Sequence, residues 1–228
     1  MDMGLEIHKL ADASFIEQML GLPDRAWSTK ANFQCTSQPI PKIIHFVWLG
    51  SQLPPKYCAH VQLMADTNPT WKVHLWADHP HVAPTAVNAT NFEVRDVMQY
   101  AHMFRNWDLI LKETNIAGKA DYLRMEAVYL EGGVYVDTDT IAHLSFDSFE
   151  DIFRWPFVAY DLLYKNICNG VFGFEKKAPF LDFALNLTRE NCVKFSTCGV
   201  NGRARLHRLQ MIRVCMWGLR GYVGFVDL

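Results

Sequence analysis

The sequence lacks the features that mark several large classes of protein. None of its apolar runs is long enough for a membrane-spanning helix, and the N-terminus shows no signal peptide. Its 22 basic and 24 acidic residues nearly cancel and form no basic stripe interleaved with aromatic side chains, which argues against nucleic acid as a partner. Internal repeats and low-complexity tracts are missing too, which excludes solenoids and arrays.

Cysteine and histidine are present, but not in the spacings that metal centres use. The six cysteines form no C-x-x-C pair and are too sparse for a disulfide scaffold, so we interpret them as small buried residues. The nine histidines are scattered, and the His-Pro-His of residues 79–81 falls in a proline-broken loop. The sequence therefore predicts no metal site built on histidine or cysteine.

The pattern of apolar residues is that of an α/β protein. Half of the 228 residues are hydrophobic, enough for one sizeable core. We predict strands at 42–48, 71–76, 134–136, 157–160 and 171–174, and helices at 56–65, 96–113, 117–130 and 178–188. Because helices separate the strands, we expect a mostly parallel sheet flanked by helices.

Residues 119–139 are the most informative segment. An amphipathic helix with Asp121 and Arg124 three apart on one face runs into a Gly-Gly pair, which suits a left-handed helix end. A short apolar strand follows and is tipped by Asp137 and Asp139. These carboxylates therefore emerge at the carboxyl edge of the sheet, where open α/β sheets bind ligands.

The two carboxylates form a candidate metal site. If strand alternation continues past the strand, Asp137 and Asp139 project from the same side, and two hard oxygen ligands suit Mn²⁺ or Mg²⁺ holding a diphosphate. An Asp-Thr-Asp after a strand can also be an ordinary turn. Likewise, Asp121 and Arg124 can be an exposed ion pair worth a few tenths of a kcal/mol. Their convergence on one sheet edge favours the site.

Four motifs carry a resemblance to a known family. They are residues 40–50 (IPKIIHFVWLG), 120–124 (ADYLR), 131–139 (EGGVYVDTD) and 169–174 (NGVFGF). Over residues 40 to about 185 the chain resembles glycosyltransferases with a D-x-D sugar-binding region. This group includes bacterial capsular-polysaccharide sugar transferases, fungal α-mannosyltransferases, animal α-1,4-sugar transferases and the glucosylating domain of large clostridial toxins. The resemblance implies a GT-A fold and retaining transfer of a sugar from a nucleotide-sugar donor.

The resemblance also implies which residues act. Asp139 would bind the metal ion, Mn²⁺ or Mg²⁺, directly, and Asp137 would contact the ribose and the water shell of the metal. These two aspartates are our candidate catalytic residues. Asp121 and Arg124 would hold hydroxyl groups of the donor sugar.

Three further residues complete the implied donor site. Trp48 would stack on the uracil base, Tyr135 would line the donor pocket, and Asn169 would lie near the transferred sugar. Trp48 and Tyr135 also fit a simpler role as core aromatics, an alternative that is stronger for Tyr135.

Two other functions stay open. Residues 134–140, VYVDTDT, also fit the D-x-D-x-T motif of haloacid-dehalogenase-like phosphatases, with Asp137 as nucleophile and Asp139 as general acid/base. Such an enzyme needs an acidic pair after a downstream lysine, but the later carboxylate cluster at 147–151 precedes the lysines at 176–177. The other alternative is a nucleotide-sugar-binding module with impaired catalysis.

The C-terminal region keeps that alternative open. Residues 201–208, NGRARLHR, have Arg203 where the family has proline and His207 where it has threonine, and the chain stops at Leu228. We therefore expect the segment that closes the donor site to have no counterpart, which would slow sugar transfer more than donor binding.

These expectations define the organisation of the chain. We predict a helical extension over residues 1–38, a GT-A-type catalytic domain over 39–190 and a divergent tail over 191–228. Expected partners are a UDP- or GDP-sugar donor and a glycan, glycolipid or protein acceptor. The compartment stays open: the cytoplasm is the default, but eukaryotic relatives work in the Golgi, and glycosylation sequons begin at Asn88 and Asn186.

Overall fold

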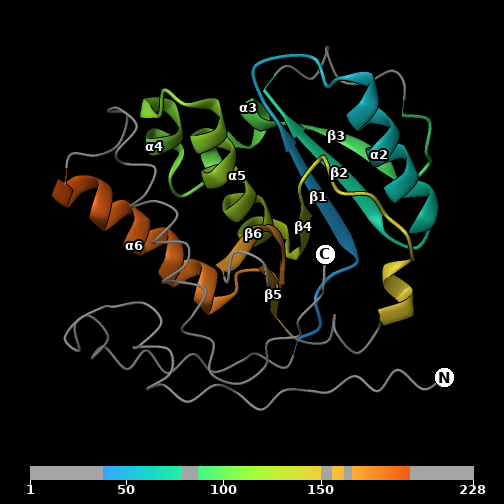
Figure 1. The fold of residues 1–228 in the computed structure, drawn as a ribbon. Coiled ribbons are helices and arrows are strands. Elements are labelled where there is room, and N and C mark those ends of the chain that lie inside the picture. The colour runs from blue at the N-terminus through green and yellow to red at the C-terminus, as the bar shows by residue number, and fades with distance from the viewer. Residues whose placement is uncertain (1–37, 79–86, 150–155, 162–165, 196–228) are drawn as a thin grey trace. The chain divides into compact units, whose positions relative to one another are not determined.

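Figure 1 shows the chain as a computed structural model, which describes residues 38–78, 87–149, 156–161 and 166–195. The predicted helical extension, apart from residue 38, and the divergent positions Arg203 and His207 lie outside the described residues. The predicted domain boundaries stay predictions.

The described residues form one six-stranded sheet in the order β3-β2-β1-β4-β6-β5. The strands are β1 (Ile43–Trp48), β2 (Lys72–Ala77), β3 (Phe92–Asp96), β4 (Gly133–Val136), β5 (Phe157–Asp161) and β6 (Asn166–Phe174). Neighbours from β3 to β4 are parallel, whereas β6 runs antiparallel to both β4 and β5. The expectation of a mostly parallel sheet is confirmed.

Side chains of the central strands alternate between two different faces. Helix α2 (Pro55–Thr67) covers one face, and helix α5 (Ile116–Glu131) lies on the other side of the sheet (Figure 1). The α2 face is apolar and packs the buried residues Ile44, Phe46, Val61, Met64, Ala65, Val73, Leu75, Val134 and Val136. The α5 face instead carries His45, His74 and Tyr135, which contact residues of α5 or its C-terminal cap. Polar chemistry therefore gathers under one helix.

The passage from α5 into β4 is tight. Gly132 and Gly133 have φ angles of +71° and +111°, which confirms the left-handed helix end expected from the sequence. A Cβ atom on Gly133 would lie 2.4 Å from the Ile43 carbonyl oxygen. The Gly-Gly pair thus lets α5 and β4 meet β1 at close range.

One predicted helix is wrong. Instead of a helix over residues 96–113, the chain forms strand β3 and then three short elements: α3 (Val97–Tyr100), the 3-10 turn η2 (Ala101–Met103) and α4 (Trp107–Lys112). The break has a tertiary cause, because the backbone N–H groups of Arg105 and Asn106 donate to the Glu126 carboxylate of α5 at 3.0 and 2.7 Å. A continuous helix would use those N–H groups internally.

Helix α6 (Pro179–Phe195) packs against α5 and the start of α4. Arg189 of α6 pairs with Asp108 and donates to the Arg105 carbonyl at 2.7 Å, and Arg105 pairs with Asp182. Cys192 of this helix is buried, as interpreted from the sequence, and is disulfide-bonded, whereas the buried Cys58 is free. No helix among the described residues has the length and apolarity to span a membrane.

Candidate functional site

Arg124 is the hub of the candidate site. Its guanidinium lies 3.1 Å from Asp121 on the same helix and 3.1 Å from Asp137 at the end of β4. It also donates to the Asn169 carbonyl oxygen at 2.8 Å, and the Asn169 amide donates to Asp121 at 3.1 Å. Three separate elements, α5, β4 and β6, are thus joined through one side chain that is only 10% exposed.

Tyr135 contacts two members of this cluster, Asp137 and Arg124. Its hydroxyl donates to Asp137 Oδ1 at 2.6 Å, and the Arg124 guanidinium lies 4.6 Å from the centre of its ring. The ring is 2% exposed and packs on Phe172. Burial raises the pKa of the Tyr135 hydroxyl well above its ordinary value, so this group stays a hydrogen-bond donor. Tyr135 therefore holds Asp137 and Arg124 in place; its predicted contact with a donor stays a prediction.

Asp139 lies beyond the strand, in a turn. The Thr140 N–H donates to the Asp137 carbonyl at 3.0 Å, and His60 of α2 contacts the Thr138 carbonyl at 3.1 Å. Strand alternation ends at Val136, so it does not set the direction of the Asp139 side chain. Asp139 is exposed, at the same sheet edge as Asp137.

Trp48 ends β1 at this same edge but on the other face. Its indole packs on the α2 core and lies 5.5 Å from the Tyr57 ring, measured between ring centres. The indole N–H is buried and, within the described part of the chain, has no acceptor. Trp48 is only partly buried, so one portion of it is open to a ligand.

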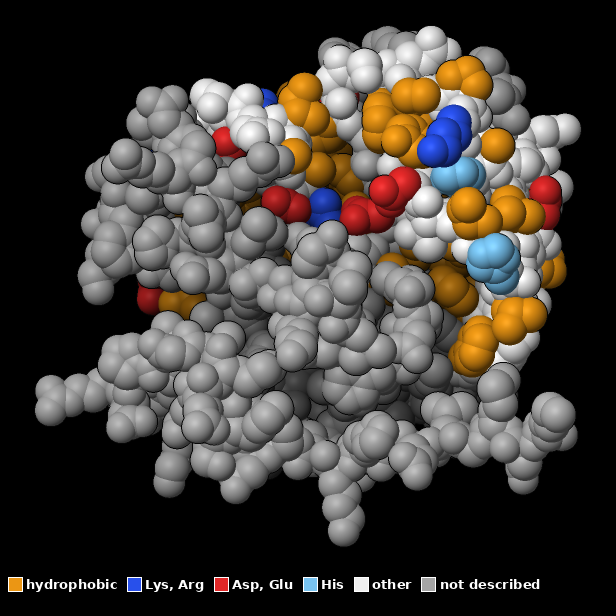
Figure 2. All heavy atoms as spheres, viewed as in Figure 1, with side chains coloured by type: hydrophobic (Ala, Val, Ile, Leu, Met, Phe, Trp, Pro, Cys, Tyr) orange, Lys and Arg blue, Asp and Glu red, His pale blue; other side chains and the backbone are white. Residues whose placement is uncertain are grey.

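The cluster has a charge imbalance that suits a cation. Asp121, Asp137 and Asp139 against Arg124 leave a formal charge of −2, from three carboxylates and one guanidinium. Figure 2, which has the same view as Figure 1, shows acidic side chains on either side of a basic one in the middle of the described surface. Oxygen ligands with excess negative charge are those that Mn²⁺ and Mg²⁺ prefer.

The two aspartates of the D-x-D motif fit a divalent ion. Asp137 Oδ1 is occupied by Tyr135 and Arg124, whereas among the described residues no hydrogen bond or ion pair reaches Oδ2. The side chain of Asp137 is 39% exposed, and the Asp139 carboxylate likewise has no described partner. Both therefore keep hard oxygen atoms for a ligand.

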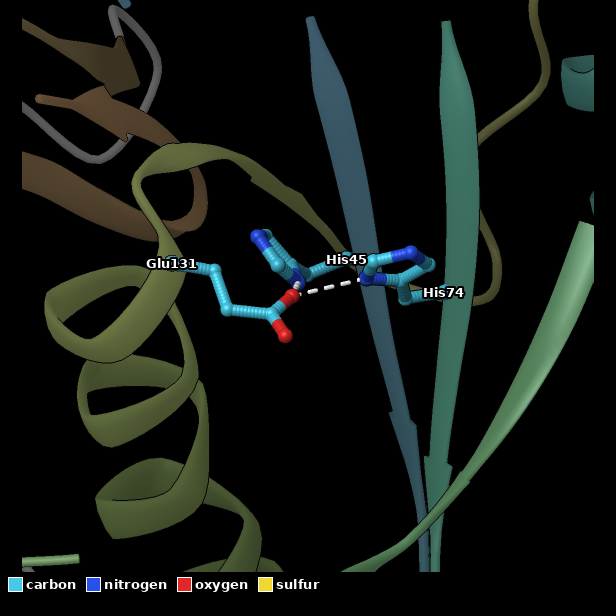
Figure 3. Close-up of side chains that lie close together, drawn as sticks. All are labelled: His45, His74 and Glu131. Carbon is cyan, nitrogen blue, oxygen red and sulfur yellow. Dashed lines mark hydrogen bonds and ion pairs between the residues drawn. The ribbon is translucent and has the colours of Figure 1, made fainter. Parts of the chain in front are cut away.

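A second polar cluster, which the sequence analysis missed, lies under the C-terminal end of α5. The side chains of His45, His74 and Glu131 offer three atoms within 4.8 Å of one another (Figure 3). His45 and His74 are partners in the register of β1 and β2, and each is the third residue of its strand. This matching position was a usable signal, but it lies within strands that otherwise look apolar.

Comparison with known proteins shows which family this part of the chain resembles. Residues 54–153, which include α2, Asp121, Arg124 and the D-x-D turn, match the family described as "Glycosyltransferase sugar-binding region containing DXD motif". Over this segment the chain is similar to that glycosyltransferase family.

Two curated relatives are named as glycosyltransferases. The chain is 26% identical over 145 residues to inositol phosphoceramide mannosyltransferase 3 of Schizosaccharomyces pombe, covering 64% of this chain and 36% of the relative. It is also 26% identical over 148 residues to the uncharacterized glycosyltransferase L373 of Acanthamoeba polyphaga mimivirus, covering 63% of this chain and 53% of the relative. The chain thus spans between about a third and a half of the length of these two relatives.

Solved structures confirm the GT-A-type fold. The PaToxG glycosyltransferase superposes with a TM-score of 0.63 at 16% identity, over 80% of this chain and 70% of that chain. The UDP-bound glycosyltransferase domain of the YGT toxin superposes with a TM-score of 0.50 at 10% identity, over 80% of this chain and 68% of that chain. At these identities the likeness establishes the fold of the chain alone.

Proposed function

We propose that this glycosyltransferase binds a nucleotide sugar together with Mn²⁺ or Mg²⁺ and transfers the sugar, with retention of configuration, to a hydroxyl group of a glycan, lipid or protein. The observation that carries the proposal is the joining of Asp121, Arg124, Asp137 and Asn169 at the carboxyl edge of the sheet, beside the exposed Asp139. That edge is where open α/β sheets bind nucleotides.

Each residue has a chemical role in this proposal. Asp139 and the free oxygen of Asp137 would hold the divalent ion, which neutralises the charge of the leaving diphosphate. Arg124 donates directional hydrogen bonds and Asp121 accepts them, so together they read the hydroxyl groups of a sugar. Trp48 offers an aromatic surface on which a base stacks. Tyr135 keeps Asp137 oriented while these partners bind.

The ion cluster also explains how the site stays ordered before a donor arrives. Arg124 is paired with carboxylates on two sides, so its buried charge is compensated. A sugar hydroxyl that enters can exchange hydrogen bonds with Arg124 and Asp121 without leaving either charge unpaired. We therefore expect the donor to bind without a large rearrangement of α5 or β4.

Names of relatives support a nucleotide sugar and leave its identity open. One solved neighbour is a UDP-bound domain, and one relative is named a mannosyltransferase of inositol phosphoceramide. UDP is therefore the first nucleotide to test, with GDP beside it. A lipid-linked hydroxyl is the first acceptor class to test.

A thermal-shift panel of UDP- and GDP-sugars, with and without Mn²⁺, tests binding, because a ligand of the native state raises the melting temperature. Assays for nucleoside diphosphate release, with and without acceptor, test transfer. Stabilisation that requires both nucleotide sugar and Mn²⁺, followed by acceptor-dependent release, supports the proposal. Binding without release would indicate a binding module, and hydrolysis of phosphate esters would indicate the phosphatase alternative. Failure of every nucleotide sugar to bind would refute the proposal.

A further inference from the structure

The buried cluster under the end of α5 has a defined set of hydrogen bonds. The Trp76 indole N–H lies 3.0 Å from His45 Nδ1, and His45 Nε2 lies 2.7 Å from the Gly132 carbonyl oxygen. Next to it, His74 Nδ1 lies 2.8 Å from Glu131, while His74 Nε2 lies 3.3 Å from the Arg95 guanidinium. Both imidazoles are almost fully buried.

These contacts fix the proton positions. An indole N–H can only donate, so His45 Nδ1 accepts and the proton lies on Nε2, which donates to Gly132. A guanidinium can only donate as well, so His74 Nε2 accepts and its Nδ1–H donates to Glu131. Burial lowers the pKa of His45 to about 4, in agreement with a neutral ring.

The same contacts argue against a metal ion in this cluster, although three ligand atoms lie close together. A metal needs a free lone pair on each imidazole, and His45 uses its one lone pair for Trp76 and its one proton for Gly132. His74 is committed in the same way to Arg95 and Glu131. The cluster is a closed hydrogen-bond network.

The network holds the joint between the two halves of the donor site. Arg124 lies on α5 before Gly132, and Asp137 lies just after β4, which begins at Gly133. A Cβ on Gly132 would lie 2.6 Å from the backbone nitrogen of Lys176, and one on Gly133 would lie 3.1 Å from His45 Nε2. The joint is packed on several sides, and His45 supplies its side-chain hydrogen bond.

We propose that His45 is a positioning residue for the donor site. Its Nε2–H bond to the Gly132 carbonyl sets how α5 enters β4, and this sets the position of Arg124 relative to Asp137. The inference rests on the proposed function, because the ligand of that site is the nucleotide sugar. A displaced Arg124 would bind the donor less well even where the fold is intact.

Two matched variants separate this role from general support of the core. His45→Asn places its amide near Nδ1, so it keeps the contact with Trp76 and loses the bond to Gly132. His45→Gln places its amide near Nε2 and keeps the bond to Gly132. Glu126→Gln is the control, because Glu126 is buried on the same helix but faces Arg105 and Asn106.

The experiment measures calorimetric binding of UDP in the presence of Mn²⁺, thermal unfolding, and hydrogen exchange of peptides covering residues 132–137. We expect His45→Asn to weaken UDP binding about tenfold and to speed exchange at the joint. His45→Gln should stay within about twofold of the wild type, and Glu126→Gln should bind UDP as the wild type does. The melting temperatures of the two His45 variants should be similar.

Each outcome decides the inference. Equal UDP affinity and equal exchange at 132–137 in both His45 variants would overturn it, as would stoichiometric zinc in the wild-type protein that His45→Asn loses. If the wild type binds no UDP, the proposed function fails with UDP as ligand, and the exchange data alone decide whether His45 anchors the joint. Faster exchange spread over the whole chain in His45→Asn would show a general structural role and would also overturn it.

Discussion

Two clusters of titratable side chains lie along α5, and they differ in how many of their polar atoms are already hydrogen-bonded. In the middle of the helix, Arg124 joins Asp121 and Asp137 at an edge where Asp137 is 39% exposed and Asp139 is exposed. At the helix end, His45 and His74 are buried, and every ring nitrogen has a partner.

The difference shows how to distinguish a binding site from a cluster with a structural role. The first cluster keeps unused acceptor oxygens that face solvent, so it can exchange internal partners for a ligand. The second cluster has no spare donor or acceptor on its imidazoles, so a ligand would have to break existing bonds. Proximity of titratable groups alone does not identify a binding site; spare hydrogen-bonding capacity does.

The largest effect on stability is expected from a substitution where α5 joins β4, next to the buried histidine cluster. Gly133→Ala puts a Cβ at φ +111° and 2.4 Å from a backbone oxygen that cannot move aside. We expect a loss of about 3 kcal/mol or more in the free energy of unfolding, measured by urea titration. Gly50→Ala is the control: its φ is +81°, but its Cβ would meet only the flexible end of Ile116, so it should cost roughly 1 kcal/mol. Similar losses in both variants would contradict the tight joint.

A substitution in the exposed cluster around Asp137 and Asp139 should leave the stability of the fold unchanged. Asp139→Asn removes one anionic oxygen from an exposed turn, so we expect Mn²⁺-dependent UDP binding to fall by about 100-fold with an unchanged melting temperature. Calorimetry with and without Mn²⁺ measures this. Unaltered metal-dependent affinity in the folded variant would reject Asp139 as a metal ligand.

Substitution of Trp48 tests whether the donor site extends to this residue, because its indole also packs partly against the core. Trp48→Ala should weaken UDP binding by about 1 to 3 kcal/mol if the indole stacks on the base, and Trp48→Phe should recover most of that loss. Urea titration of the same variants reports the core contribution. A loss of stability in Trp48→Ala with unchanged UDP affinity among folded molecules would assign Trp48 to the core alone.

Glu126 is a buried carboxyl group on α5 that belongs to neither cluster, so changing it should affect neither. Burial raises the pKa of Glu126 to about 7, although the hydrogen bonds from the Arg105 and Asn106 N–H groups lower it. The folded chain then binds a proton that the unfolded chain releases above pH 4.5, so this group lowers stability as pH rises to about 7. Between pH 6.5 and 7.5 we expect a loss of roughly 0.7 kcal/mol, which Glu126→Gln abolishes. Equal pH slopes in both proteins would contradict the buried titration.

Local patterns in the sequence were sufficient to predict most of the sheet and the meeting of Asp121 with Arg124. The helix stop at Gly132 and the strand of β4 follow from residue type, because only glycine adopts these φ angles freely and apolar β-branched residues favour strands. Asp137 reaches the same edge because the carboxyl ends of parallel strands meet there.

Other features depended on tertiary partners that no local pattern contains. Strand β3 is only partly buried and carries charged residues, so its alternation is weak. The interruption after it requires Glu126, some twenty residues away, to take the N–H groups of Arg105 and Asn106. His45 and His74 look like exceptions in apolar strands until the sheet pairs them.

The loop that follows the D-x-D turn has a further consequence. Asp147 accepts hydrogen bonds from Lys42 at 2.7 Å, from Thr70 and from the Trp71 indole at 3.0 Å, and these bonds lower its pKa to about 2. The neighbouring Phe146 N–H donates to Asn68. The segment from Thr138 to Phe146 is therefore a short loop held at both ends, by His60 at Thr138 and by Asn68 at Phe146. Lengthening this loop would lower donor affinity without removing any ligand residue. The longer loop would have more conformational entropy in the unbound protein, and binding would have to remove that entropy.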